Sequence, residues 1–372
     1  MFQLQTLVIL SPGFPENEND STCLPTQQTF ILSLKKKHPE IKIIVLAFEY
    51  PFNKLEYDWF GIEVIGFGGR NRNRFYRLYN WLRVWQRLKK IIGQNRGVGL
   101  LSFWFDECAF IGHYFSKFHK LEHFSWLLGQ DARPGNRYFK LVNPKPESLI
   151  ALSDFIQQTV FDNYGIFPAH TITSGIDTSL YKKFEQLRDI DVLGVGSLIK
   201  LKRFDLFIAA IINIKIYYPE IKAVIIGDGP EMLEIQQIIG VNNLQENLIL
   251  KGEVPHDEVL ALMQRTKIFL HTSIYEGFAA VLLEALYAGA HVISFTKPMY
   301  KPIKHLHIVK NQVEVQKKLI ELLAVEGLDH SAVLPFPVDA AVGSIIELYN
   351  QSDKITCSIS EAMASKESLS LK

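Results

Sequence analysis

The sequence predicts an α/β protein made of two doubly wound domains, each with a parallel sheet between layers of helices. Short apolar runs alternate with segments of helical apolar spacing in two successive series, which is the pattern of parallel sheets. A polar stretch at residues 173–190 separates the two series. A length of 372 residues is also long for a single hydrophobic core.

The first series runs from residue 6 to residue 164. Residues 6–10 form an apolar run that we predict to be the first strand, and a loop at 11–25 follows it. Gly13 in this loop would let a substrate approach the backbone, whereas a mobile surface loop is the alternative. The other predicted strands are 41–48, 64–67, 100–105 and 148–153, and the predicted helices are 27–37, 77–92 and 154–164.

The second series follows residues 173–190, which we predict to be the linker between the domains. Its predicted strands are 192–195, 222–226, 248–250, 268–270 and 292–295, and its predicted helices are 203–217, 231–239, 256–265 and 278–288. We therefore expect a first domain at 1–172, a second at 191–337, a C-terminal helix at 338–351 that could cross back, and a polar tail at 352–372. Ligands of two such domains would bind in a cleft at the carboxyl ends of the strands.

The composition argues against several classes of function. The formal net charge is +1, so the whole chain is not expected to bind a nucleic acid. Cys23, Cys108 and Cys357 lie far apart, without the spacing of a metal site or a disulfide framework. The N-terminus has the pattern of a strand rather than of a signal peptide, and no apolar run approaches the ~18 residues that span a bilayer. We expect a cytoplasmic protein without a bound metal.

Residues 266–295 form the most informative stretch. Glu276 lies in the turn after the 268–270 strand, Gly277 lets the backbone bend, and Glu284 lies inside the following helix. The N-terminus of that helix offers backbone N–H groups and a partial positive charge, which suit a phosphate. Carboxylates on each side would hold sugar and ribose hydroxyls, so the stretch predicts a sugar-nucleotide site. The alternative is an ordinary crossover with two acids that face solvent.

This stretch resembles the donor-site motif of the retaining glycosyltransferases of family 4, which have two Rossmann-like domains (the GT-B fold). That family carries two Glu residues with seven residues between them and Gly-Phe after the first, and Glu276-Gly277-Phe278 and Glu284 match. The resemblance extends over roughly residues 145–300, although Ser174 stands where the family usually has Asn. It implies that Glu284 accepts ribose hydroxyls and Glu276 holds the donor sugar. It also implies that the diphosphate lies at the backbone of Gly277, Phe278, Ala279, Ala280 and Val281.

Glycine-containing segments after three other strands are also similar to the family. The resemblance implies donor contacts at Gly196, Ser197, Gly227, Gly252 and Val254. Family members place an Arg and a Lys in the first of these segments to neutralise the diphosphate; Lys202 matches the Lys, but Ser197 occupies the Arg position. The adjacent Arg203 could replace the missing charge. A solvent-exposed basic helix N-terminus is the alternative.

The first domain carries a looser resemblance. The segment Gly129-Gln130-Asp131 is similar to the family loop that faces the reacting sugar, which implies that Asp131 belongs to the catalytic site. The family's His in this loop is replaced by Leu128. A carboxylate that caps a helix is the alternative for Asp131.

Residues 70–90 are rich in Arg and Lys, contain no acid, and interleave these cations with aromatic residues. Such a helix can lie on an anionic membrane or meet a phosphorylated lipid-linked acceptor. The alternative is a solvated helix with its aromatic side chains in the core.

The leading hypothesis is a retaining, metal-independent glycosyltransferase of the hexosyltransferase type. Its co-substrate would be a nucleotide-diphosphate sugar, it would need no further cofactor, and its acceptor would be a glycan, a lipid-linked compound or another hydroxyl compound. Polysaccharide or glycolipid biosynthesis is the expected role, in the cytoplasm or peripherally at the inner membrane face. One alternative is a nucleotide-sugar epimerase, which the spacing of Glu276 and Glu284 disfavours. The other is a catalytically weak sugar-nucleotide-binding partner, which Ser197 and Leu128 favour.

Overall fold

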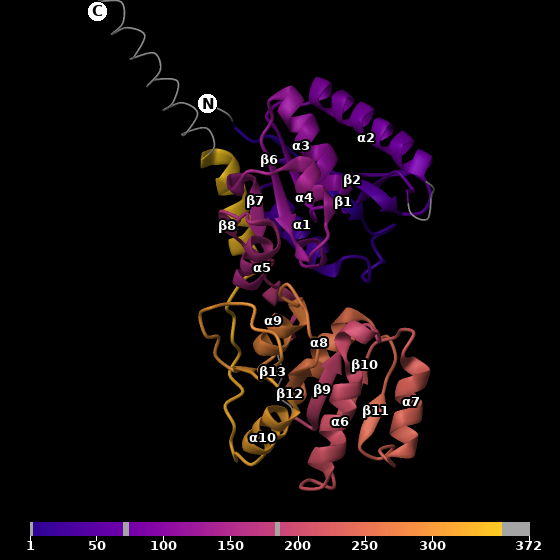
Figure 1. The fold of residues 1–372 in the computed structure, drawn as a ribbon, viewed down its shortest axis with the longest axis vertical. Coiled ribbons are helices and arrows are strands. Elements are labelled where there is room, and N and C mark those ends of the chain that lie inside the picture. The colour runs from indigo at the N-terminus through magenta and orange to yellow at the C-terminus, as the bar shows by residue number, and fades with distance from the viewer. Residues whose placement is uncertain (1–2, 70–73, 183–186, 352–372) are drawn as a thin grey trace, which may run out of the picture. The chain divides into compact units, whose positions relative to one another are not determined.

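The computed structural model describes residues 3–69, 74–182 and 187–351. The chain divides into two compact units, one made of Met1–Ser174 with Val338–Lys372 and the other of Gly175–Pro337 (Figure 1). The division falls inside the 173–190 segment. Residue 190 of that segment already begins the first strand of the second unit.

The first unit is built on an eight-stranded sheet with the order β3-β4-β2-β1-β5-β6-β7-β8. All neighbouring strands are parallel except β3 and β4, which form a hairpin. Phe60 and Gly61 connect this hairpin with φ angles of 47° and 73°, the backbone that a type I′ turn requires. The strands are β1 (Thr6–Gly13), β2 (Lys42–Tyr50), β3 (Leu55–Trp59), β4 (Ile62–Gly66), β5 (Val98–Phe103), β6 (His123–Leu127), β7 (Leu149–Ala151) and β8 (His170–Thr171).

Helices cover both faces of this sheet, as the doubly wound prediction requires. Leu10 of β1 packs in one core cluster with α2 and α3. Leu7 is also fully buried, and it points to the opposite face because side chains alternate along a strand. Phe30 of α1 packs edge-on against Phe103 of β5. The helices are α1 (Pro25–Lys37), α2 (Arg74–Gln94), α3 (Glu107–His119), α4 (Arg137–Val142) and α5 (Asp154–Tyr164).

A helix at residues 338–351 packs against the first unit, although it follows the second unit in the sequence (yellow in Figure 1). Tyr349 is fully buried, and its hydroxyl donates to the carbonyl of Leu100 at 2.6 Å. Gly99 makes room for this ring, since a Cβ there would lie 2.6 Å from Tyr349. Asp339 accepts a hydrogen bond from Ser33 of α1 at 2.8 Å. The chain therefore returns to the first unit after Pro337.

The second unit contains a six-stranded sheet with the order β11-β10-β9-β12-β13-β14, and every neighbouring pair is parallel. The order reverses between β9 and β12, and such a switch point is where open α/β sheets bind ligands. The strands are β9 (Ile190–Val195), β10 (Ala223–Ile226), β11 (Leu248–Leu250), β12 (Thr266–His271), β13 (His291–Ser294) and β14 (Leu306–Ile308).

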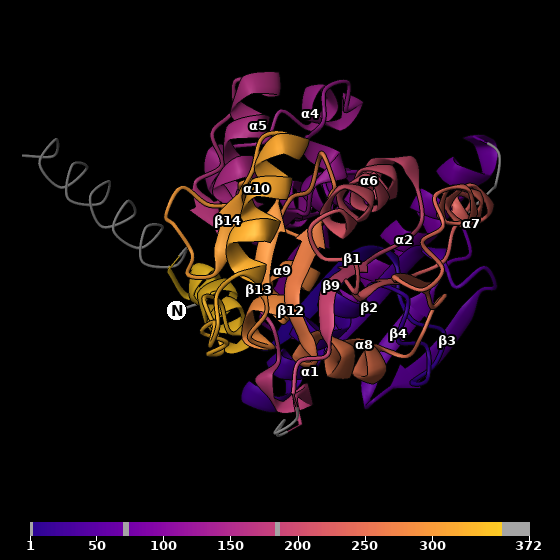
Figure 2. The same ribbon diagram turned by 90° about the horizontal axis from the view of Figure 1, so that it is seen from below.

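Helices also lie on both faces of this second sheet. Figure 2 shows α6 and α10 on one side of the strands and α8 on the other. The side chains of α6, α7 and α10 share one core cluster with the sheet, while α8 packs against α9. The helices are α6 (Phe204–Lys215), α7 (Met232–Val241), α8 (His256–Gln264), α9 (Ala280–Tyr287) and α10 (Gln312–Leu323). The predicted two-domain α/β fold class is confirmed.

Within the described ranges, no helix combines the length and the apolar character that crossing a bilayer demands.

Candidate functional site

The loops that follow β9, β10 and β11 interlock at the carboxyl edge of the second sheet. The amide of Gly196 donates to the carbonyl of Ile226 at 3.0 Å, and the amide of Gly227 donates to the carbonyl of Gly252 at 2.9 Å. A Cβ on Gly227 would lie only 2.0 Å from the carbonyl oxygen of Gly196. Gly227 has a φ of 140°, so both the space and the backbone require glycine. The structure thus brings together three predicted donor-site glycines: Gly196, Gly227 and Gly252.

Lys202 and Glu276 form an ion pair beside these loops. Lys202 ends the short helical turn Lys200–Lys202 after β9, and Glu276 lies in the loop between β12 and α9. The Thr272 hydroxyl donates to the carbonyl of Lys202 at 2.7 Å and ties the two segments together. The two charged side chains are only 21% and 18% exposed, so the pair is partly shielded from water. Two predicted site residues from distant parts of the sequence therefore meet.

Glu284 is paired with a histidine that the sequence analysis did not single out. Its Oε1 lies 2.9 Å from Nε2 of His256, the first residue of α8. The hydrogen bond to Glu284 raises the pKa of His256 above its ordinary value. The hydroxyl of Tyr181 also donates to the carbonyl of Glu284, at 3.1 Å. The only signal for His256 was its position directly after the family-like segment that contains Gly252 and Val254.

The N-terminus of α9 has no side-chain cap. Its N-cap residue Ala279 supplies no side-chain hydrogen bond, and the first turn contains no acid. Backbone N–H groups at the start of a helix have no partner one turn earlier, so those of Ala280 and Val281 can bind an anion, whereas that of Leu282 donates to the carbonyl of Ala279 at 3.0 Å. The helix begins at Ala280, two residues later than predicted, because Phe278 turns its ring into the core against Phe336. Among the predicted donor residues, Phe278 can therefore contribute only its backbone.

Two buried polar side chains lie at the end of β12, next in the chain to this loop. His271 bonds Ser294 through Nδ1 at 3.1 Å, and burial, assisted by the charge of Lys202, lowers its pKa to about 3. The imidazole is therefore neutral at physiological pH. Among the described residues, Nε2 of His271 and Oγ of Ser273 have no hydrogen-bond partner.

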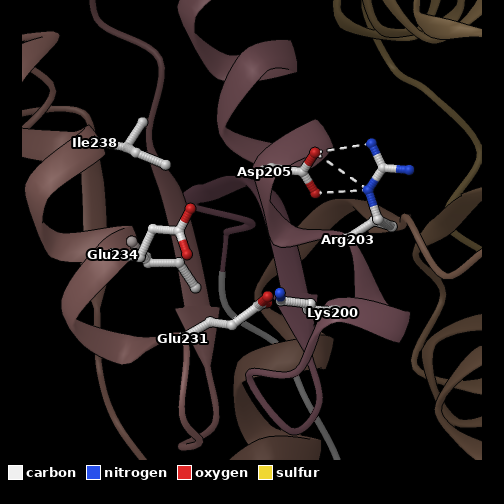
Figure 3. Close-up of a pocket in the computed structure, with 7 residues that line it drawn as sticks. Lys200, Arg203, Asp205, Glu231, Glu234 and Ile238 are labelled. Carbon is white, nitrogen blue, oxygen red and sulfur yellow. Dashed lines mark hydrogen bonds and ion pairs between the residues drawn. The ribbon is translucent and has the colours of Figure 1, made fainter.

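Arg203 does not join Lys202, contrary to the role we predicted for it. Its guanidinium forms a fork with Asp205, with Nε–Oδ1 and Nη2–Oδ2 distances of 2.8 Å. Arg203 has a left-handed backbone with a φ of 53° at the start of α6, and Asp205 lies two residues further along the helix. The two side chains border a separate pocket of about 290 Å³ that also contains Glu231 and Glu234 (Figure 3). The charge missing at Ser197 is thus not replaced by Arg203 in this structure.

Asp131, in the first unit, braces a loop. Its carboxylate accepts backbone N–H groups of Phe105 and Gly129 at 2.8 Å and of Leu128 at 3.3 Å. The residue is 7% exposed, and burial raises the pKa of its carboxyl while the backbone donors oppose this shift. The carboxylate therefore holds loop backbone, which is close to the structural alternative for Asp131, and its contact with the reacting sugar stays a prediction.

Gly13 lies at the end of β1 rather than in the loop where we predicted it. It pairs with Tyr50 of β2 after an irregularity in the register. It borders a pocket of about 470 Å³ in the first unit, together with Asp20 and Cys23. Burial, followed by the charge of Asp20, raises the pKa of Cys23 to about 12, which keeps this thiol protonated at neutral pH.

The part of the chain that the structure describes contains no group of three or more His, Cys, Asp or Glu side chains that could hold a metal ion.

Residues 177–329 match the family model of the group 1 glycosyl transferases. The second unit, which this match spans almost entirely, is similar to the group 1 glycosyl transferases, and we refer to it as the group 1 domain. The match includes every residue of the Lys202–Glu276 and His256–Glu284 pairs. It confirms the resemblance predicted for this half of the chain.

One relative of this chain is the phosphatidylinositol N-acetylglucosaminyltransferase gpi3 subunit of Schizosaccharomyces pombe, which is 37% identical over 105 residues. The alignment covers 28% of this chain and 23% of that protein, so the chain spans about a quarter of the length of this relative.

Two solved structures match nearly the whole chain. A glycosyltransferase from Rickettsia africae superposes with a TM-score of 0.71 and 14% identity, covering 93% of this chain and 98% of that one. HepE from Anabaena, in complex with UDP and glucose, superposes with a TM-score of 0.64 and 16% identity, covering 97% and 100%. At these identities the likeness establishes the fold, which is GT-B.

Proposed function

We propose that this chain is a retaining glycosyltransferase that moves a sugar from a nucleotide-diphosphate sugar to a hydroxyl group of a glycan or lipid-linked acceptor. The observation that carries this proposal is the arrangement in the group 1 domain. Glu276 of the partly buried Lys202–Glu276 pair lies in the loop before the uncapped N-terminus of α9, and Glu284 projects from that helix.

The charges of this arrangement match the parts of such a donor. Lys202 and the first-turn N–H groups of α9 would bind the diphosphate, because both present positive charge. Glu284, oriented by His256, would accept the ribose hydroxyls. Glu276 would hold the hydroxyls of the sugar, and its ion pair would position Lys202 before the donor binds.

The proposed reaction exchanges one bond at the anomeric carbon. The bond from this carbon to the phosphate oxygen breaks, and its electron pair stays with the nucleoside diphosphate. The acceptor oxygen attacks from the face that the phosphate leaves, which retains the configuration, and its proton passes to the departing phosphate oxygen. Lys202 and the α9 N-terminus stabilise the charge that develops on the diphosphate. The mechanism thus requires neither an enzymic base nor a metal ion.

The relatives support this choice of substrates. HepE was solved with UDP and glucose, so a uridine diphosphate sugar is the first donor to test. The name of the Schizosaccharomyces pombe relative includes phosphatidylinositol and N-acetylglucosamine, which points to a lipid acceptor and to N-acetylglucosamine among the sugars to be tested.

A weakly catalytic sugar-nucleotide-binding partner is a second candidate. The observation in its favour is that Ser197 replaces the family's Arg while Arg203 is bound to Asp205. Less positive charge would then stabilise the leaving diphosphate. The nucleotide sugar would still bind, but turnover would be low.

Calorimetry with UDP, GDP and ADP in the presence of EDTA tests the donor site. We expect one nucleoside diphosphate to bind with EDTA present, because the proposed site uses a lysine and a helix N-terminus rather than a metal. Binding that requires added Mg²⁺ or Mn²⁺ would contradict the metal-free site. Binding to none of the three nucleotides, with or without metal, would contradict the proposed function. Tight binding without transfer from any matching sugar donor would favour the binding partner.

A further inference from the structure

An apolar groove lies between α2 and α3 of the first unit. It is lined from α2 by Leu78, Trp81, Leu82 and Trp85, and from α3 by Phe110, Ile111 and Tyr114. Its volume is about 420 Å³, and none of these side chains is charged. Figure 1 shows α2 along the outer side of the first unit, with α3 beside it. We call this groove, together with the exposed residues that border it, the α2–α3 face.

Large apolar side chains project around the groove instead of closing over it. Leu82 is 64% exposed, Phe75 at the start of α2 is 83% exposed, and Phe118 near the end of α3 is 73% exposed. Phe118 lies next to Trp85, with ring centroids 6.4 Å apart, so it extends the lining of the groove. A contiguous apolar surface of this kind on a protein marks an interaction site.

Most charges that border the groove are positive; the exception is Glu107, which accepts a hydrogen bond from Trp81 and pairs with Arg77. Helix α2 has six Lys or Arg residues and no Asp or Glu. Arg87 is bound to Glu56 and Glu63, but Lys89 and Lys90 are exposed. Lys89 follows Leu82 by seven residues, which places both on the same side of the helix. Lys117 of α3 and Lys120, which directly follows that helix, are exposed on each side of Phe118 and His119. Residues 70–73, which belong to the basic segment that the sequence singles out, lie outside the described residues.

We propose that the α2–α3 face binds the surface of an anionic lipid bilayer. Phe75, Leu82 and Phe118 enter the boundary between headgroups and acyl chains, and Lys89 and Lys117 meet lipid phosphates. A second copy of the chain fits less well, because two such faces would bring like charges together. The border of lysines around an uncharged groove also favours phospholipid over a protein surface. This inference deepens the proposed function, because binding to the bilayer would bring the enzyme to a membrane-bound acceptor. The relevance of the face to catalysis rests on that proposed function.

Sedimentation with phosphatidylcholine vesicles, with and without phosphatidylglycerol, tests the proposal on the full chain without donor or acceptor. We expect binding to the anionic vesicles and weak or no binding to the neutral ones, with a decrease at high salt. Leu82→Asp should weaken binding at least about tenfold, because it removes an inserted apolar side chain and adds a negative charge. The matched control is Val241→Asp, at the end of α7 in the second unit, where the residue is 82% exposed. This control should bind like the unchanged protein.

The basic border is tested separately. Lys89→Ala and Lys117→Ala should each weaken binding about fivefold, since a lysine near an anionic surface contributes about 1 kcal/mol. Circular dichroism checks that every variant is folded. Absence of vesicle binding, equal binding to both kinds of vesicle, or unchanged binding by folded Leu82→Asp would overturn the proposal. A concentration-dependent dimer that Leu82→Asp dissociates would assign the face to a second copy and would also overturn it. Nucleotide calorimetry on the same variants reports on the donor site, so the two proposals fail independently.

Discussion

Replacing Glu284 should weaken nucleoside diphosphate binding while leaving the fold intact. Glu284→Ala removes the carboxylate whose Oε1 lies 2.9 Å from Nε2 of His256. A hydrogen bond to a charged group is worth about 1.5–3 kcal/mol, so the loss of the ribose contacts should lower affinity about 10- to 100-fold. Alanine is a good helix former, so α9 should persist. Calorimetry with the nucleoside diphosphate measures the change. Unchanged affinity in a folded variant would refute the ribose assignment.

Glu276→Gln is the matched comparison, because it alters the other carboxylate and keeps its shape. It removes the negative charge that pairs with Lys202 and leaves that lysine to the diphosphate. Nucleoside diphosphate affinity should therefore stay the same or rise, while sugar transfer should fall at least about tenfold as the sugar loses a charged hydrogen-bond acceptor. Calorimetry with the diphosphate and turnover with the sugar donor separate the two effects. An equal loss in both assays would indicate that Glu276 contacts the nucleotide rather than the sugar.

Three further predictions concern the surrounding residues. Lys202→Ala should lower turnover at least about tenfold, whereas Arg203→Ala should change turnover less than about threefold, because the Arg203 guanidinium is bound to Asp205. Steady-state kinetics with the sugar donor compares the two variants. Equal losses of turnover would show that Arg203 acts in the donor site. Asp131→Ala should lower the free energy of unfolding by about 3 kcal/mol or more, since three backbone N–H groups lose their acceptor; urea unfolding measures this, and an undiminished stability would contradict its bracing role. The pKa of His256 is raised above 6.5, so its pairing with Glu284 stabilises the fold fully below that pH and less as the pH rises through the raised value. The thermal midpoints of the unchanged protein and of His256→Gln should therefore converge with rising pH. A difference that stays constant with pH would contradict this linkage.

The sequence was sufficient to predict the alternation of strands and helices and much of the second unit. The helix predicted at 154–164 is α5 (Asp154–Tyr164), because the Ser153 hydroxyl caps its start and Gly165 ends it in a left-handed conformation. Helix α10 was not predicted, although Asn311 and Glu314 have the spacing of a helix cap and Val315, Leu319 and Leu322 recur at helical intervals. A search for capping residues would have found it.

The candidate site was predictable only where one local segment carries it. Glu276 and Glu284 belong to a single strand–turn–helix segment, and Lys202 lies in a recognisable turn. The ion partner of Glu284 is 28 residues away on α8, and sequence spacing does not determine which helices become neighbours. The pairing of Arg203 with Asp205 depends on a left-handed backbone at Arg203, which its residue type does not predict. For Asp131, the outcome depends on three backbone N–H groups, which are present in every loop and leave no mark in the sequence.

Product analysis with isotope-labelled sugar donors tests the central claim most directly. The unchanged protein is incubated in EDTA with the sugar form of the nucleotide that binds and with a lipid extract. The product is then examined by NMR for its anomeric configuration. We expect a labelled product with the configuration of the donor, and its loss in Glu276→Gln. A product of inverted configuration would contradict the retaining mechanism. A bound donor that is never transferred, to lipid or to any glycan acceptor, would contradict the assignment of this chain as a glycosyltransferase.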